Sequence, residues 1–207
     1  MACSLVSIDL LRLETGTAVR SLQNTPLREG DGPPSLEFSR DGRRLLAAPI
    51  NSTELPIWNL EKGQITRLQL EHREGLFTAS FSDDGEWVVT TSFDAFASLW
   101  EVDSGRELAR FTGQLTGFSD ASISPDKTRV ALTGNSIYGS ELSVWDPVNE
   151  QQLVSFPAQR GRGRLIGWDP NADTIATVDD SFKLRLWHAP SWAEIEAAQK
   201  GGLVTRW

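Results

Sequence analysis

The 207-residue sequence predicts an all-β fold, a β-propeller assembled from repeated four-stranded sheets. Two ladders of similar residues support this prediction. One is a Trp that follows an apolar strand, at spacings of 42, 45 and 42 residues: Trp58, Trp100, Trp145 and Trp187. The other is a turn segment that begins 20, 19, 22 and 19 residues earlier, at Phe38, Phe81, Ile123 and Trp168. A period of roughly 40 to 45 residues with four strands per unit is typical of propeller blades.

The unit with the clearest pattern runs from His72 to Asp103. Its apolar runs are rich in β-branched and aromatic residues, which favour strands. Asp84-Gly85 lies between the first two runs and favours a tight hairpin, because both residues tolerate positive φ. The unit is therefore predicted to be an antiparallel meander.

The chain begins partway through a unit, so residues 4–23 are predicted to be a half-blade made of a third and a fourth strand. The polar connection that follows contains Pro and Gly and predicts a loop. Four blades are predicted after it, at about 36–70, 76–112, 118–156 and 165–187.

The loops of these blades are predicted in more detail at two places. The third hairpin of each of the first three blades needs a residue with positive φ, and the candidates are Gly63, Gly105 and Asn149. Residues 134–140 predict a longer loop in the third blade.

The C-terminal segment departs from the strand pattern. Ser191 followed by Glu194 forms a capping box, and Gly201 is a suitable helix stop, so a short helix is predicted over residues 191–200. The fourth blade consequently lacks an evident outer strand.

The repeated residues resemble the tryptophan–aspartate (WD) repeat propellers, from about Leu5 to His188. His72 occupies the histidine position of that family, and Asp94 occupies its turn position. Among the four Trp residues that follow the third-strand segments, only Trp145 is followed directly by Asp, as Trp145-Asp146. The C-terminal ending is similar to that of bacterial WD-repeat proteins, so the chain resembles the C-terminal part of such a protein. Because one fold hosts many functions, the resemblance indicates the fold far more than the activity.

Four blades and a half-blade are fewer than the seven that this family commonly uses. A closed four-blade ring would require each blade to subtend a much larger angle, so an incomplete ring, part of a longer propeller, is the favoured prediction. An open arc leaves two apolar blade faces uncovered, which favours self-association.

Composition restricts the classes of partner. A formal charge of -8 and 23% charged residues argue against a nucleic-acid or anionic-membrane partner. Cys3 is the one cysteine and cannot form an internal disulfide. The N-terminus lacks a basic start, and no segment has the roughly 20 apolar residues that span a bilayer. A cytoplasmic location is predicted.

The family resemblance also implies a hydrogen-bonded network in the second blade. Its members would be His72, Thr90 or Ser92, Asp94 and Trp100. A structural role is favoured over a catalytic one, since such a network holds loops between strands. His72 and His188 are the two histidines of the chain, and with one cysteine they do not predict a metal site. No catalytic residue and no cofactor are predicted.

The remaining candidates are surface residues that would bind a partner. One basic cluster, Arg160, Arg162 and Arg164, precedes the fourth blade. The aromatic candidates are Tyr138, Phe93 and Phe96. Arg and aromatic side chains are good contact anchors, and propeller loops gather on one rim. The alternative is a mobile polar loop and aromatic residues that pack between blades.

These features predict a non-catalytic scaffold or regulatory module that binds a protein or peptide, within a larger bacterial protein. Two alternatives remain open. One is a structural arc that other chains complete by self-assembly. The other is a propeller enzyme such as a glycosidase or lactonase, which would need a central cluster of acids or metal ligands.

Overall fold

The computed structural model describes residues 8–22, 35–49, 52–72, 75–92, 94–113, 117–136, 139–159, 163–179 and 181–188. These ranges contain 17 strands and no helix. The predicted C-terminal helix, residues 191–200, lies outside the described residues, as do both ends of the predicted half-blade.

Five antiparallel sheets follow one another along the chain. The N-terminal hairpin contains β1 (Ile8–Leu11) and β2 (Ala18–Leu22). Blade one contains β3 (Ser35–Phe38), β4 (Arg44–Ala48), β5 (Glu54–Asn59) and β6 (Gln64–Gln69). Blade two contains β7 (Leu76–Phe81), β8 (Trp87–Ser92), β9 (Phe96–Glu101) and β10 (Glu107–Thr112). Blade three contains β11 (Gly117–Ile123), β12 (Val130–Ser136), β13 (Gly139–Asp146) and β14 (Gln151–Gln159). The fourth sheet contains β15 (Gly163–Trp168), β16 (Thr174–Asp179) and β17 (Leu184–His188).

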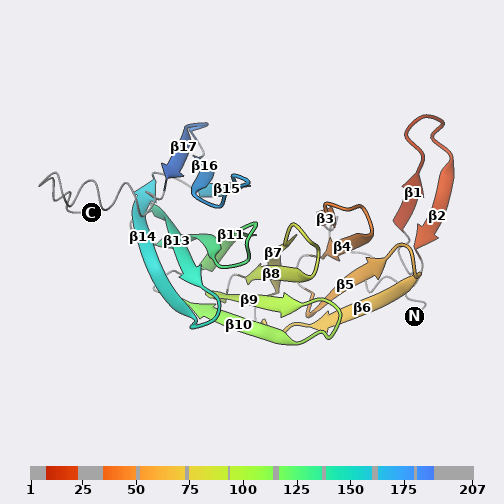
Figure 1. The fold of residues 1–207 in the computed structure, drawn as a ribbon, viewed down its shortest axis with the longest axis horizontal. Coiled ribbons are helices and arrows are strands. Elements are labelled where there is room, and N and C mark those ends of the chain that lie inside the picture. The colour runs from red at the N-terminus through yellow and green to blue at the C-terminus, as the bar shows by residue number, and fades with distance from the viewer. Residues whose placement is uncertain are drawn as a thin grey trace, which may run out of the picture.

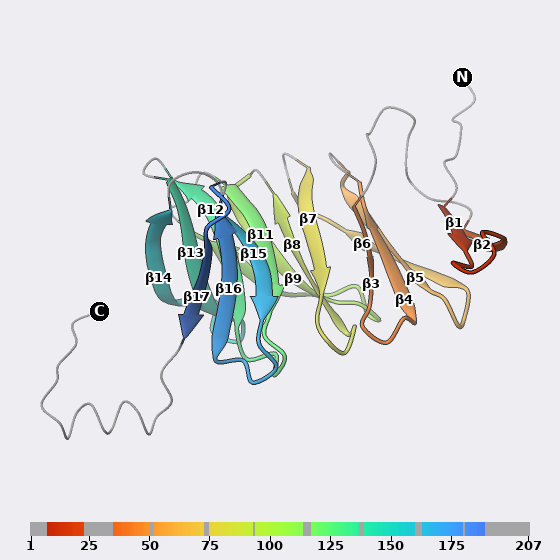
Figure 2. The ribbon, with the colours of Figure 1, turned by 90° about the horizontal axis from the view of Figure 1, so that it is seen from above.

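The sheets stand side by side in an arc (Figures 1 and 2). Their first strands, β3, β7, β11 and β15, lie on the concave side, and the outer strands β6, β10 and β14 lie on the convex side (Figure 1). The N-terminal hairpin and the fourth sheet form the two ends of the arc and do not meet. The predicted all-β propeller architecture with an incomplete ring is confirmed. Three blades have the predicted four strands, whereas the fourth sheet has three among the described residues.

The turn between the first two strands of each blade is built on one pattern. In blade two, the Ser82 hydroxyl donates to Asp84 Oδ1 at 2.6 Å, and the Trp87 N–H donates to the Ser82 hydroxyl at 3.0 Å. Ser39 and Ser124 make the same bonds in blades one and three. The turn at Asp84-Gly85 is longer than the predicted tight hairpin, because it begins at Ser82. Of this pair, only Gly85 has positive φ (70°).

Two loop predictions in blade three are wrong. Most of the predicted loop at residues 134–140 is strand, because the β12–β13 ladder continues to the pair Ser136 and Gly139. The positive φ of the third hairpin falls on Glu150 (54°) instead of Asn149. The amide of Asn149 instead donates to Asp146 at 2.7 Å and holds the turn.

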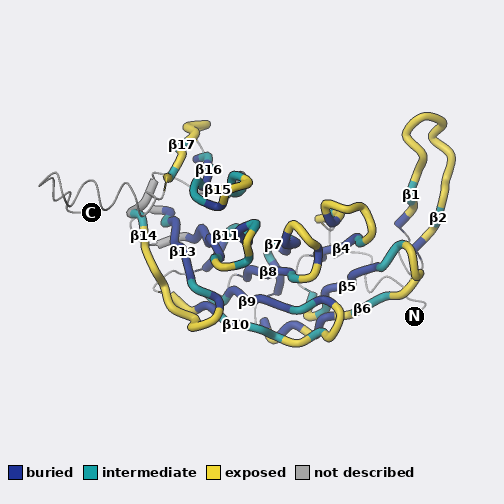
Figure 3. Tube along the Cα trace, in the orientation of Figure 1, coloured by how far each residue is buried: buried dark blue, intermediate teal, exposed yellow. Residues whose placement is uncertain are grey.

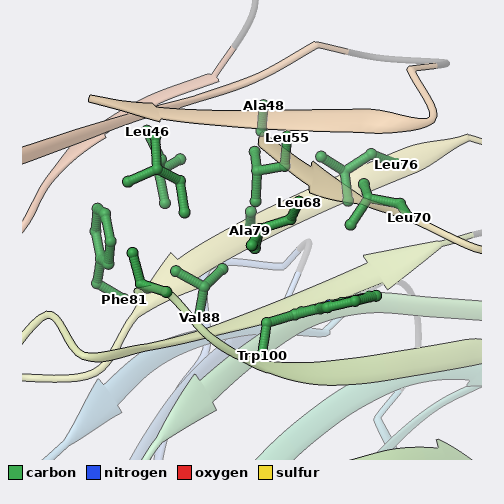
Figure 4. Close-up of a cluster of buried hydrophobic side chains, with 12 residues drawn as sticks. Leu46, Ala48, Leu55, Leu68, Leu70, Leu76, Ala79, Phe81, Val88 and Trp100 are labelled. Carbon is green, nitrogen blue, oxygen red and sulfur yellow. The ribbon is translucent and has the colours of Figure 1, made fainter. Parts of the chain in front are cut away.

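Many strand residues are buried (Figure 3), and apolar side chains pack between neighbouring blades. Between blades one and two, leucines of β4 to β7 pack with Val88 and Trp100 of blade two (Figure 4). Between blades two and three, Phe111 of β10 packs against Trp145 of β13, with ring centroids 5.6 Å apart. Burial of side chains of this size contributes roughly 1.5–3 kcal/mol each, so the blades form one continuous packed array.

Ion pairs link the turns of adjacent blades on one rim. Arg40 of blade one pairs with Asp83 of blade two. Lys127 of blade three reaches back to Glu86 at 2.8 Å and lies 4.8 Å from the centre of the Trp87 ring. Lys127 has φ 59° at the position where Gly42 and Gly85 stand in the other blades. The contacts of its side chain offset the cost of this backbone conformation.

Candidate functional site

The residues implied by the family resemblance come together in blade two. His72 follows β6, Thr90 lies in β8, Trp100 lies in β9, and Asp94 lies in the turn between these two strands. His72 Nε2 is 3.1 Å from Thr90 Oγ1, and Trp100 Nε1 donates to the same hydroxyl at 3.0 Å. His72 Nδ1 is 3.4 Å from Asp94 Oδ1. The network therefore joins the connection between β6 and β7, which contains His72, to the turn between β8 and β9, which contains Asp94.

The protonation of His72 follows from its surroundings. Burial lowers the pKa of His72, and the Asp94 carboxylate only partly opposes this effect. The neutral ring satisfies every contact if Nδ1–H donates to Asp94 and Nε2 accepts from the Thr90 hydroxyl. Thr90 then accepts from Trp100, so each polar atom of the network has a partner.

Ser92, the predicted alternative to Thr90 in the network, makes its hydrogen bond within the turn that carries Asp94. Its hydroxyl accepts from the Asp94 N–H at 3.2 Å, and Asp94 Oδ1 accepts from the Phe96 N–H at 3.2 Å. Ala95 adopts a φ of 65° within this turn. Ser92 therefore fixes the turn that carries Asp94, while Thr90 contacts the histidine.

The network is enclosed by protein. His72 is 6% exposed and Trp100 3%, and Thr90 and Ser92 have no exposed surface. A nucleophile and base that are buried and hydrogen-bonded to each other offer no face to a substrate. The arrangement can hold a loop in place, and it satisfies buried polar groups as the interior of a protein requires.

The other blades keep parts of this network. Trp145 Nε1 donates to the Ser143 hydroxyl at 2.8 Å, and Trp187 Nε1 donates to Thr177 at 2.9 Å. Trp58 Nε1 of blade one is buried, and no described residue forms a hydrogen bond with it. Trp58 pairs with Leu45 and Trp100 with Val88, so Ala47, two residues after Leu45, corresponds to Thr90, two residues after Val88. An alanine at that position explains the unpaired indole nitrogen.

The predicted partner-binding residues are not gathered into one site among the described residues. Arg160, Arg162, Tyr138 and Phe93 lie outside them. Arg164 is exposed on β15 of the fourth sheet, and Phe96 is half-buried at the start of β9 in blade two.

Two acidic side chains on the concave side were missed by the sequence analysis. Glu37 of β3 accepts from the Phe81 N–H at 3.1 Å, and Asp120 of β11 accepts from the Ala121 N–H at 3.0 Å. Burial raises the pKa of both carboxyls, and that of Asp120 rises to about 6. Neither residue occupies a repeated sequence position, so no spacing signalled them. Both are engaged by backbone amides, unlike the free acid cluster that a glycosidase would need.

Replacing Asp120 by asparagine is expected to stabilise the chain at pH 7. Because the folded-state pKa of about 6 lies above the ordinary value of 3.8, ionised Asp120 destabilises the fold at neutral pH, and this penalty is absent below pH 3.8. We expect the Asp120→Asn chain to gain about 1–2 kcal/mol at pH 7 and the gain to shrink as pH falls through 6. Urea unfolding at pH 7, 6 and 5 measures this; equal or lower stability of the variant at pH 7 would contradict it.

The described ranges contain neither a metal-binding cluster nor a membrane-spanning helix. In these ranges, no three or more His, Cys, Asp or Glu side chains are arranged to hold a metal ion. The same ranges contain no helix whose length and apolar character would let it cross a bilayer.

Comparison with known proteins gives one family match. Residues 63–101 match the WD domain, G-beta repeat family. The matched segment begins at β6, the outer strand of blade one, and ends with β9, the third strand of blade two. One sequence repeat is therefore offset from one blade, and it contains all four residues of the His72 network.

Relatives are similar over longer stretches. Protein HIR1 of Cryptococcus neoformans is 25% identical over 80% of this chain, and Transcriptional corepressor LEUNIG_HOMOLOG of Arabidopsis thaliana is 27% identical over 74% of it. An uncharacterized WD repeat-containing protein of Deinococcus radiodurans is 31% identical over 45% of the chain and 38% of its own length. The chain spans only 22% of the HIR1 protein and 24% of the corepressor. The described sheets thus form an open arc of propeller-like blades, and residues 63–101 of this arc match the WD domain, G-beta repeat family.

Proposed function

We propose that this chain is a non-catalytic protein–protein interaction module that displays loops and strand edges from a rigid array of blades. The observation that carries the proposal is the burial of the His72 network, whose polar atoms are hydrogen-bonded to one another. The chemistry-bearing residues thereby stabilise the blades, which leaves the exposed turns and edges as the functional surface. The similarity to a transcriptional corepressor supports a regulatory role of this kind.

We further propose that the chain is part of a larger, cytoplasmic bacterial protein. The similarity to the Deinococcus WD repeat-containing protein supports a bacterial source, and the low share of each relative that the chain covers supports a larger whole. The net charge of -8 supports a protein or peptide partner over nucleic acid or an anionic membrane.

The basic cluster at Arg160, Arg162 and Arg164 is the proposed first contact with that partner. Replacing the three arginines by alanine is expected to weaken binding at least tenfold, because Arg side chains are frequent anchors of interfaces. The measurement is the affinity of a partner isolated on the immobilised wild-type chain, by surface plasmon resonance.

A matched control removes the same charge elsewhere. Arg12, Lys62 and Arg106 are exposed, and their joint replacement by alanine changes the net charge equally. Affinity that is unchanged in the first variant, or equally weakened in the control, would reject the Arg cluster as the contact. Failure of the folded chain to bind any protein would reject the module itself.

A second candidate function, self-assembly of the arc, is favoured by apolar side chains at its two ends. Leu11 and Val19 of the N-terminal hairpin are 57% and 62% exposed, and Leu184 and Leu186 of β17 are 58% and 68% exposed. A concentration-dependent mass in solution would favour this alternative.

A further inference from the structure

The outer strand of blade three is exposed in a way that the other outer strands are not. Every residue of β14 from Gln151 to Ser155 is exposed, including Leu153 (52%) and Val154 (39%). By contrast, Leu68 of β6 and Phe111 of β10 are fully buried. The difference arises because the fourth sheet has three strands among the described residues and contacts β14 at its far end, where the Phe156 ring lies 4.6 Å from the Trp187 ring of β17. Residues 151–155 of β14 stay exposed (Figure 3).

The free edge of β14 also lacks charge. Its nine residues, Gln151–Gln159, include no Asp, Glu, Lys or Arg, whereas β6 carries Arg67 and β10 carries both Glu107 and Arg110. Charged side chains are a common protection of edge strands against pairing. The β10 edge has additional cover, because the Arg110 N–H donates to Glu150 at 3.2 Å. Over its described length β14 pairs with β13 alone, so its other side presents unpaired backbone groups.

A polar groove lies beside this edge, on the face that blade three turns toward blade two. It has a volume of about 470 Å³. The groove opens where β10 ends, because β13 and β14, with eight and nine residues, are longer than the six-residue β10. Its lining consists of Thr112, Gly113, Glu141, Ser143, Trp145, Gln152 and Ser155.

Glu141 is the one ionisable side chain in that lining. The Ser155 hydroxyl donates a hydrogen bond to the Glu141 carboxylate, so the carboxylate lies against β14. In the part of the chain that the structure describes, no cation forms an ion pair with it. A residue on a strand added outside β14 would lie next to Ser155, about 4.8 Å farther out, and a lysine or arginine there can reach the carboxylate.

We propose that the outer edge of β14, from Gln151 to Phe156, binds an extended peptide of a partner protein as an added strand. A Lys or Arg of the peptide enters the groove and pairs with Glu141, and an apolar residue on the opposite face packs on Val154. Pro157 ends the usable edge because proline has no N–H to donate. Backbone pairing supplies affinity in this mode and alternate side chains supply specificity. The inference rests on the proposed interaction function.

The test uses the full 207-residue chain and a labelled hexapeptide of alternating valine and threonine with one central lysine. Fluorescence anisotropy is expected to give a dissociation constant in the micromolar range. Glu141→Lys is expected to weaken binding of this peptide at least tenfold. A peptide with glutamate in place of lysine is expected to bind the Glu141→Lys chain more tightly than the wild-type chain. Glu14→Lys makes the same charge change at an exposed turn residue and serves as the control.

Backbone pairing is tested with two peptides that are N-methylated on alternate residues. Only one of the two can keep the hydrogen bonds that face β14, so one is expected to bind normally and the other at least tenfold more weakly. Absence of peptide binding by the folded chain would overturn the proposal, as would equal binding of both methylated peptides or insensitivity to Glu141→Lys.

Two other outcomes separate the possibilities for β14. A dimer that pairs through β14, detected by light scattering and lost on adding charge at Val154, would assign the edge to a second copy and overturn the peptide proposal. A natural partner that binds the Glu141→Lys chain with unchanged affinity would overturn the inference while leaving the proposed interaction function intact.

Discussion

Replacing Phe111 by alanine is expected to lower the free energy of unfolding by about 3–5 kcal/mol. The side chain is fully buried between blades two and three, against Trp145. Its removal leaves a cavity that the strands on either side cannot close, because their backbones are fixed in two separate ladders. Urea unfolding followed by circular dichroism measures the loss.

Phe182 provides the control for this prediction. It is 92% exposed, in the loop before β17, so Phe182→Ala is expected to change stability by less than about 0.5 kcal/mol. A loss below about 1 kcal/mol for Phe111→Ala would contradict a continuous packed core between the blades.

Replacing Thr90 by valine is expected to cost about 2–4 kcal/mol. Valine has nearly the same shape, so packing is kept while the hydroxyl is removed. The variant leaves Trp100 Nε1 and His72 Nε2 buried without the partner that joins them, and each unsatisfied group costs about 1–3 kcal/mol. The midpoint of urea unfolding gives the loss, and an intact far-ultraviolet spectrum shows that the strands persist.

Blade one offers the reverse experiment. Because Trp58 Nε1 has no hydrogen-bond partner in the described part of the chain, Ala47→Ser is expected to supply one and to raise stability by up to about 1 kcal/mol. Serine is only slightly larger than the fully buried alanine. Little loss for Thr90→Val together with no gain for Ala47→Ser would show that the indole hydrogen bonds do not stabilise the blades.

Much of the fold was predictable because it repeats. The Trp ladder marks the third strand of each of the four sheets that follow the N-terminal hairpin, and Trp58, Trp100 and Trp145 are all buried where that ladder places them. The turn ladder works because Ser82 and Asp84 bond to each other and to the next strand, which is a purely local arrangement. Features fixed by a few neighbouring residues can be inferred from spacing alone.

The errors occur where local chemistry leaves a choice. Glu150 takes the positive φ expected of Asn149, because the Asn149 amide bonds back to Asp146. The β12–β13 ladder extends into a predicted loop although Gly134 lies within it, because pairing with Glu141 continues the sheet. In both places hydrogen bonds within a hairpin override the preference of a single residue.

The residues of the candidate sites also differ in whether a sequence pattern marks them. Trp100 stands at a repeated position and Asp94 at the turn position of the family, and the structure brings them to His72 and Thr90. Asp120 stands at no repeated position, and its raised pKa depends on burial by the neighbouring sheet, which spacing does not reveal. The exposure of the β14 edge depends on how much of this strand the fourth sheet covers. That is a property of the assembled arc and not of any one segment.

The most direct test of the open arc as an interaction module is small-angle X-ray scattering of the purified chain, coupled to light scattering. We expect a monomer of 22.9 kDa whose scattering fits an open crescent, with exposed ends and edges available to a partner. A compact closed particle would contradict the open arc. A dimer or larger assembly would contradict the monomeric module and favour the self-assembling alternative.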